Sequence, residues 1–107
     1  MQEVSMYDSL AQGAKQASTF LRALAHESRL LVLCLLIERG EMTVSELLEE
    51  VDLSQSALSQ HLAKMREEGM VDKRREAQSM YYYIVDPNVE RILSTLKAMF
   101  CPDDSTK

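Results

Sequence analysis

Residues 43–69, TVSELLEEVDLSQSALSQHLAKMREEG, hold two short amphipathic segments separated by a turn. Thr43 and Glu46 have the spacing of a capping box, in which a hydroxyl and a carboxylate each bond a backbone N–H, so a short helix is expected from here to about Val51. Ser54, after the turn at residues 52–54, is expected to cap a second helix over residues 55–68, which Gly69 ends. Two helices joined by so short a turn indicate a helix-turn-helix.

The second of these helices has two unlike faces. At roughly 100° per residue, Leu58, Leu62 and Met65 point together into the core. The opposite face and its flanks carry small, amide or basic side chains, which are Gln55, Ser56, Ser59, Gln60, Ala63 and Lys64. Gln pairs with adenine through two hydrogen bonds, Ser contacts either kind of base pair and Lys favours phosphate, so this face suits a DNA major groove. A purely solvated helix face would carry the same residue types.

A β-hairpin is expected after the helix-turn-helix. Residues 70–75 and 80–85 read as strands around a polar turn at residues 76–79, and the second strand has a Tyr-rich run of strong β character. The only dense basic run, Lys73, Arg74 and Arg75, lies on the first strand. At least one of the three is expected to face a phosphate backbone, although charge also protects an exposed edge strand. A hairpin in this position is a wing, so the expected fold class is mainly α, a winged helix-turn-helix.

Amphipathic helices are expected on both sides of this unit. Residues 6–25 carry an apolar stripe at helical spacing, residues 27–38 are apolar nearly all round, and Gly40 follows as a C-cap. Asp86 and Pro87 open a last helix with its own apolar stripe. The 107 residues fit a single domain, in which residues 102–107 are expected to be frayed. Both terminal stripes need a covering surface, as a homodimer would supply.

Charge and composition narrow the class of protein. The net charge is −5, but residues 54–85 carry five bases against four acids, which is compatible with a specific DNA binder. The longest apolar run has 8 residues, too few to span a membrane, and no basic-then-apolar leader opens the chain. A cytoplasmic protein is expected. No phosphate-binding glycine loop, His-Glu motif or catalytic triad is present, so neither an enzyme nor a cofactor is expected.

Four stretches resemble the ArsR family of bacterial repressors. They are residues 24–33 (LAHESRLLVL), 44–47 (VSEL), 53–62 (LSQSALSQHL) and 69–71 (GMV), the last followed by a Tyr-rich strand. The resemblance covers roughly residues 17–100, and it departs at Glu27, where the family often has Pro. It implies a homodimer built from the first and last helices, bound to a partly palindromic operator in double-stranded DNA. The two reading helices would then lie one DNA turn, roughly 34–36 Å, apart.

The metal sites common in that family are missing. Their ligand sets resemble a Cys-x-Cys near the helix before the turn, or Asp and His pairs on the last helix. Here the only histidines are His26 and His61, and His61, beside the core face, is expected to be structural. A zinc or soft-metal site needs three or four N or S ligands, so no metal is expected. A repressor with another inducer (haem or a metal), a constitutive regulator and a protein-interaction dimer remain open alternatives.

The two cysteines, Cys34 and Cys101, lie on the central helix and at the end of the last helix. This pattern resembles the branch of the family that senses sulfide-derived persulfides and oxidants, the SqrR, BigR and HlyU type. The resemblance implies that reactive sulfur species join Cys34 to Cys101 through a disulfide or polysulfide bridge and so release the DNA. Without the resemblance, Cys34 would be interpreted as a buried core residue and Cys101 as an incidental exposed thiol. No base that would lower either thiol pKa is evident in the sequence.

Overall fold

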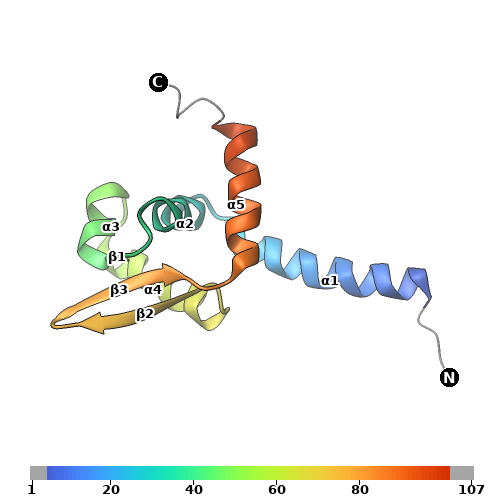
Figure 1. The fold of residues 1–107 in the computed structure, drawn as a ribbon, viewed down its shortest axis with the longest axis horizontal. Helices are drawn as coiled ribbons and strands as arrows, with labels where there is room; N and C mark the ends of the chain where they lie inside the picture. Colours follow the sequence, from blue (N-terminus) through green and yellow to red (C-terminus); the bar gives the residue numbers. More distant parts are fainter. Residues whose placement is uncertain (1–4, 102–107) are drawn as a thin grey trace.

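The computed structural model describes residues 5–101 and contains five helices and three strands. In chain order they are α1 (Met6–Leu24), α2 (Glu27–Arg39), β1 (Met42–Thr43), α3 (Val44–Glu50), α4 (Gln55–Glu67), β2 (Val71–Glu76), β3 (Ser79–Ile84) and α5 (Pro87–Phe100). Figure 1 shows α1 leaving the body as an arm, with the β2–β3 hairpin at the opposite end. The expected winged helix-turn-helix is confirmed, whereas the expected fraying of residues 102–107 lies outside the described residues.

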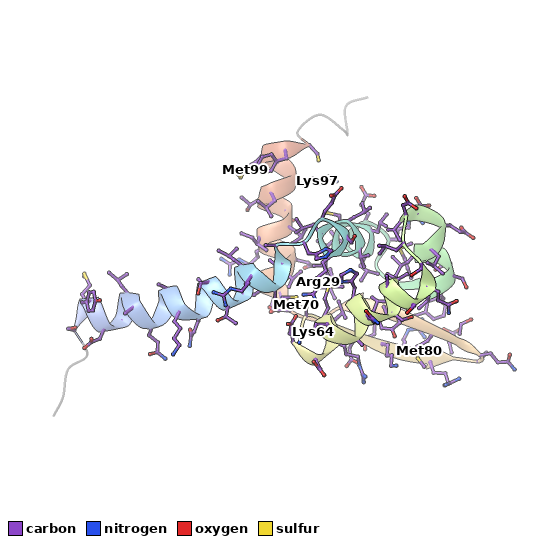
Figure 2. The ribbon with its side chains drawn as sticks, turned by 180° about the vertical axis from the view of Figure 1, so that it is seen from behind. Arg29, Lys64, Met70, Met80, Lys97 and Met99 are labelled. Carbon is purple, nitrogen blue, oxygen red and sulfur yellow. The ribbon has the colours of Figure 1, made fainter. Side chains whose placement is uncertain are left out.

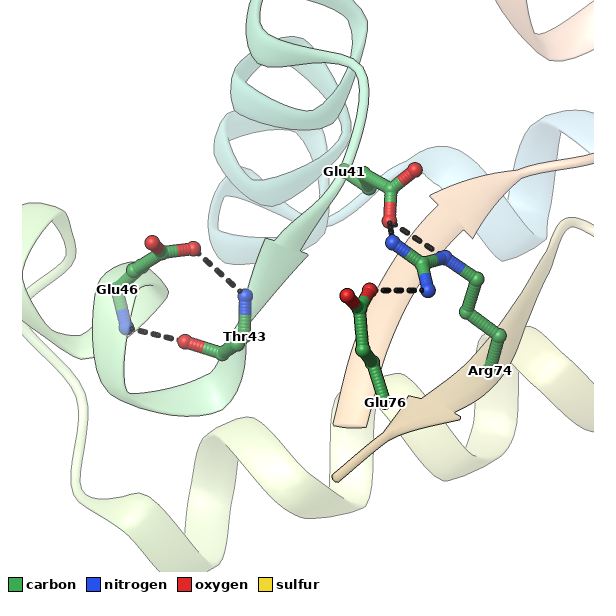
Figure 3. Close-up of polar contacts among 5 residues, drawn as sticks. All are labelled: Glu41, Thr43, Glu46, Arg74 and Glu76. Carbon is green, nitrogen blue, oxygen red and sulfur yellow. Dashed lines mark hydrogen bonds and ion pairs between the residues drawn. The ribbon is translucent and has the colours of Figure 1, made fainter. Parts of the chain in front are cut away.

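Local side-chain signals account for where these helices begin and end. In the expected capping box, the Glu46 N–H donates to Oγ1 of Thr43 at 3.1 Å and the Thr43 N–H donates to Oε1 of Glu46 at 2.9 Å (Figure 3). Ser54 caps α4 and Asp86 caps α5. Gly40 ends α2 with φ at 87°, a conformation that favours glycine. These contacts span two or three residues, and for this reason the sequence predicts them.

The core forms where α2 meets the helix-turn-helix and the wing. Leu58, Leu62 and Met65 are fully buried, as their spacing on α4 predicts. Three side chains of α2 meet them in one continuous cluster, namely Val32, Leu33 and Leu36. This helix contacts both β3 and α5, so it lies between the wing and the last helix.

The sheet has three antiparallel strands in the order β1-β3-β2, where the sequence predicted a hairpin of two. Met42 pairs with Tyr82 and Thr43 with Tyr81. A strand of two residues is too short to show an alternating pattern, so β1 escaped prediction. The expected four-residue turn at 76–79 is also wrong, because Glu76 pairs with Ser79 and only two residues remain in the loop.

The outer parts of α1 and α5 are apolar and uncovered in the single chain. Leu24 is the one buried residue of α1, whereas Met6, Tyr7 and Leu10 are 78%, 76% and 65% exposed. Met99 and Phe100 of α5 are 62% and 74% exposed. Burying such side chains would lower the free energy of the protein, which makes both helices candidates for an interface. Within residues 5–101, none of the helices has the length and apolarity needed to cross a membrane.

Candidate DNA-binding surface and cysteine cavity

The outward face of α4 presents every side chain that the sequence assigned to it. Gln55, Ser56, Ser59, Gln60 and Lys64 are all exposed. The hydroxyl of Ser54 accepts a hydrogen bond from the Ala57 N–H at 3.0 Å, which leaves other N-terminal N–H groups of α4 pointing outward. Figure 2 shows α4, with Lys64, along the lower edge of the body beside the wing. The helix thus offers amide and hydroxyl groups together with the positive end of its dipole.

The three basic residues of the wing differ in their surroundings. The Arg74 guanidinium lies 2.6 Å from Oε1 of Glu41 and 2.7 Å from Oε1 of Glu76, and these hydrogen bonds raise the pKa of Arg74 (Figure 3). Lys73 is half-buried, with Nζ 5.9 Å from the centre of the Tyr82 ring. Arg75 is exposed and forms no ion pair with any residue that the structure describes. Arg75 is therefore the residue of the three that is best placed to meet a phosphate.

A charged pair ties the end of α4 to the wing. Nε of Arg66 donates to Oδ1 of Asp72 at 2.8 Å, and the same oxygen accepts from the Lys73 N–H at 2.8 Å. The bond from Arg66, and after it the one from the Lys73 backbone, lowers the pKa of Asp72. Helix α4 and the hairpin are thereby joined by a side-chain contact as well as through their common core.

Arg29 of α2 links α1 to α4, a role that the sequence did not reveal. Its Nη1 donates to the Ala23 carbonyl at 2.8 Å, and its Nε donates to Nδ1 of His61 at 3.3 Å (Figure 2). Glu68, just after α4, lies 3.6 Å from Nη1. Burial, and after it the charges of His26 and Arg29, lowers the pKa of His61. His61 thus serves as a hydrogen-bond acceptor, in keeping with the structural role expected of it.

Cys34 and Cys101 border the same cavity, between α2 and α5. Its volume is about 580 Å³. Cys34 is half-buried on α2, and Cys101 is exposed directly after the last residue of α5. The walls are otherwise mainly apolar, with Leu30, Leu35, Leu93 and Leu96 among them. Residues 67 positions apart in the sequence therefore share one pocket, in which neither thiol is bonded.

Charge reaches this cavity from both helices. Nζ of Lys97 on α5 lies 3.3 Å from Oε2 of Glu38 on α2, and both side chains line the cavity. Burial raises the pKa of the Cys34 thiol, and the neighbouring Cys101 and Glu38 raise it further, while Lys97 opposes them. Lys97 is 63 positions from Cys34 and reaches that thiol only through folding, although it precedes Cys101 by only four positions and was overlooked there.

Among residues 5–101, no group of three or more His, Cys, Asp or Glu side chains is arranged to hold a metal ion.

Known proteins of similar sequence and structure are transcriptional regulators. Residues 26–73 match the family model described as bacterial regulatory protein, arsR family. The chain is 44% identical to the HTH-type transcriptional regulator YgaV of Escherichia coli, over 87% of this chain and 94% of that one. It superposes on the transcriptional regulator HlyU of Vibrio vulnificus with a TM-score of 0.84 and 39% identity, over 91% and 100% of the two chains. The transcriptional repressor BigR of Xylella fastidiosa gives 0.84 at 28% identity, over 95% and 100%.

Proposed function

Because the chain belongs to the ArsR family of DNA-binding transcriptional regulators, in the SqrR, BigR and HlyU branch, we propose that it is a dithiol-controlled repressor. Reduced, it binds operator DNA as a homodimer. Reactive sulfur species join Cys34 to Cys101 and release it. The observation that carries the proposal is the cavity that both cysteines border between α2 and α5.

The proposed DNA contacts come from α4 and the wing. Gln55, Ser56, Ser59 and Gln60 would contact base edges, while Lys64, Lys73, Arg74 and Arg75 would contact phosphates. The exposure of the α4 residues and of Arg75 supports this division. Arg74 would have to exchange its two carboxylate partners for a phosphate, so its contribution is expected to be the smallest of the basic residues.

The proposed dimer uses α1 and α5, which carry most of the exposed large apolar side chains of residues 5–101. Two-fold symmetry would set the two copies of α4 about 34–36 Å apart, one turn of DNA. The distance between the two copies of α4 then depends on the angle at which α5 packs against α2 within each subunit. A covalent link between these helices would alter that angle and spoil the simultaneous fit of both copies of α4.

The proposed reaction balances without a further oxidant. A thiolate at Cys101, the more exposed cysteine, takes the outer sulfur of a hydropersulfide RSSH, and the donor leaves as RSH. The Cys34 thiolate then attacks Sγ of the Cys101 persulfide, the S–S bond of that persulfide breaks, and hydrosulfide leaves. If Cys34 has also received a sulfur, the same attack gives a trisulfide. In a reducing cytosol, where structural disulfides are rare, such a bridge would act as a signal.

The test of the trigger is DNA release from cysteine variants. Cys34→Ser, Cys101→Ser and the double variant should bind an upstream promoter fragment as the reduced parent does, measured by fluorescence anisotropy. Glutathione persulfide should release DNA from the parent only, and mass spectrometry should find the bridge in the released protein. Release of the double variant by persulfide would refute the dithiol trigger.

The test of the reading helix is Gln60→Ala. Loss of a bidentate contact to a base costs about 1–3 kcal/mol of specific affinity, with little change in stability because Gln60 is exposed. Gln12→Ala is the matched control, since it removes an exposed amide from α1, on the side away from its apolar stripe. Equal operator affinities for the two variants would count against α4 as the reading helix.

A further inference from the structure

Two charged residues accompany the two cysteines, one on each helix. Glu38 follows Cys34 by four positions on α2, and Lys97 precedes Cys101 by four on α5, so each charge is one helical turn from a thiol. Nζ of Lys97 lies 3.3 Å from Oε2 of Glu38, and Figure 2 labels Lys97 on the outer half of α5. All four residues border one cavity. The ion pair and the two thiols thus lie about one helical turn apart, in the same contact between α2 and α5.

The wall around these charges is mainly apolar, while the Lys97 and Glu38 side chains themselves are 42% and 59% exposed. Apolar side chains form most of the wall, including Leu30, Leu35 and Leu93. A charge acts more strongly on a neighbouring group when little water lies between them. Within residues 5–101, the titratable groups that act on Cys34 are Lys97 on α5, Cys101 directly after that helix, and Glu38 on α2. Among them Lys97 is the one cation, and it favours the thiolate, whereas Glu38 disfavours it.

We propose that Lys97 is a positioning residue for the sulfur reaction and that Glu38 restrains it. The inference rests on the proposed function and names the residues that set the rate of its closing step. In that step the Cys34 thiolate attacks Sγ of the Cys101 persulfide, and hydrosulfide leaves with the electron pair of the broken S–S bond. Negative charge moves from one sulfur to another within the cavity that Lys97 lines. Glu38 neutralises part of the ammonium charge, and its own charge disfavours the Cys34 thiolate.

A purely structural ion pair makes a different prediction. If the contact between Lys97 and Glu38 only held α5 against α2, removing either partner would loosen the same contact. Both substitutions would then change thiol reactivity in the same direction. If the charges act on the thiolate, removing the cation slows the reaction of Cys34 and removing the anion speeds it. The sign of the effect therefore separates the two roles.

The experiment measures alkylation of Cys34 by iodoacetamide in the intact reduced protein, resolved by peptide mass spectrometry, from neutral to alkaline pH. At neutral pH, Lys97→Met should lower the rate about three- to tenfold and Glu38→Gln should raise it by a similar factor, with pH profiles displaced in opposite directions. Arg91→Met and Glu90→Gln are the controls, since they remove one charge of each sign from α5 outside the cavity lining. Both controls should leave the profile of Cys34 in place.

Changes of the same sign in Lys97→Met and Glu38→Gln, or no change in either, would overturn the inference. Circular dichroism and DNA binding of the reduced variants establish that each is folded. Alkylation needs neither persulfide nor DNA, so the two proposals can fail separately. If the alkylation rates of Lys97→Met and Glu38→Gln shift in opposite directions but persulfide releases no DNA, the proposed function is refuted and the effect of the two charges on Cys34 stands. Release that proceeds at the parent rate in both variants would refute this effect and leave the dithiol trigger standing.

Discussion

Arg29→Met is expected to be among the most damaging substitutions of a charged residue in this chain. The Arg29 side chain is 15% exposed and bonds three partners on two other parts of the molecule. They are the Ala23 carbonyl at the end of α1 (2.8 Å), Nδ1 of His61 on α4 (3.3 Å) and Glu68 after α4 (3.6 Å). Methionine keeps an unbranched stem of similar length but can form none of these contacts.

The size of the loss follows from the burial of each contact. A hydrogen bond with one charged partner contributes about 1.5–3 kcal/mol, and the short, half-buried bond to Ala23 is of this kind. The bond to His61 is longer and adds less, and the ion pair with the partly exposed Glu68 adds below about 1 kcal/mol. A total near 2–3 kcal/mol is expected. Each kcal/mol corresponds to about 4–8 °C in the melting temperature of domains near this size.

Urea unfolding followed by circular dichroism, at one protein concentration for all variants, measures this free energy. Arg39→Met is the matched control, since Arg39 is on the same helix and forms a 3.0 Å ion pair with Glu50 at the surface, where both side chains are well exposed. Its expected loss is below about 1 kcal/mol. Equal losses for Arg29→Met and Arg39→Met would refute the reasoning. Operator binding should also weaken in Arg29→Met alone, because only there does α4 lose its tie to α1.

Three further predictions concern the capping box of α3, the pKa of His61 and the arginines of the wing. Thr43→Val keeps the side-chain shape but removes the capping hydroxyl of α3, which should cost about 1 kcal/mol in urea unfolding. The pKa of His61 is lowered in the folded protein, so the unfolded chain binds the imidazole proton more tightly. The free energy of unfolding should therefore fall as pH drops below the ordinary histidine value of 6.5. This loss of stability should be smaller in His61→Gln. On the wing, Arg75→Ala should reduce operator affinity, and flatten its dependence on salt, more than Arg74→Ala does, because carboxylates already hold Arg74.

Prediction from sequence worked for most features with a local physical cause, and the hairpin turn expected at residues 76–79 is the exception. The Thr43 capping box, the Gly40 terminus and the Asp86-Pro87 start each involve residues within a few positions of one another. The burial of Leu58, Leu62 and Met65 followed from helical periodicity alone. The same periodicity placed Gln60 and its neighbours on the exposed face of α4. The ArsR resemblance, carried largely by the α4 segment, is confirmed by the family match and by the similar structures.

Prediction failed where the contact partners are remote in the chain. The Arg29–His61 bond joins positions 32 apart, and the Lys97–Glu38 pair joins positions 59 apart. No periodic pattern marks such a pair in one sequence, since each member looks like an ordinary surface charge. The strand β1 was missed for a related reason, because two residues become a strand only by pairing with β3.

The order of the five helices and the two hairpin strands, the buried stripe of α4 and the outward side chains of that helix were thus determined by the amino-acid sequence itself. Tertiary structure decided that Cys34 and Cys101 share a cavity, that Lys97 and Glu38 border it, and that Arg29 connects α1 with α4. The reason is the range of the interactions. Backbone propensity, capping and periodicity act over a few residues, whereas a pocket depends on how whole helices pack against one another.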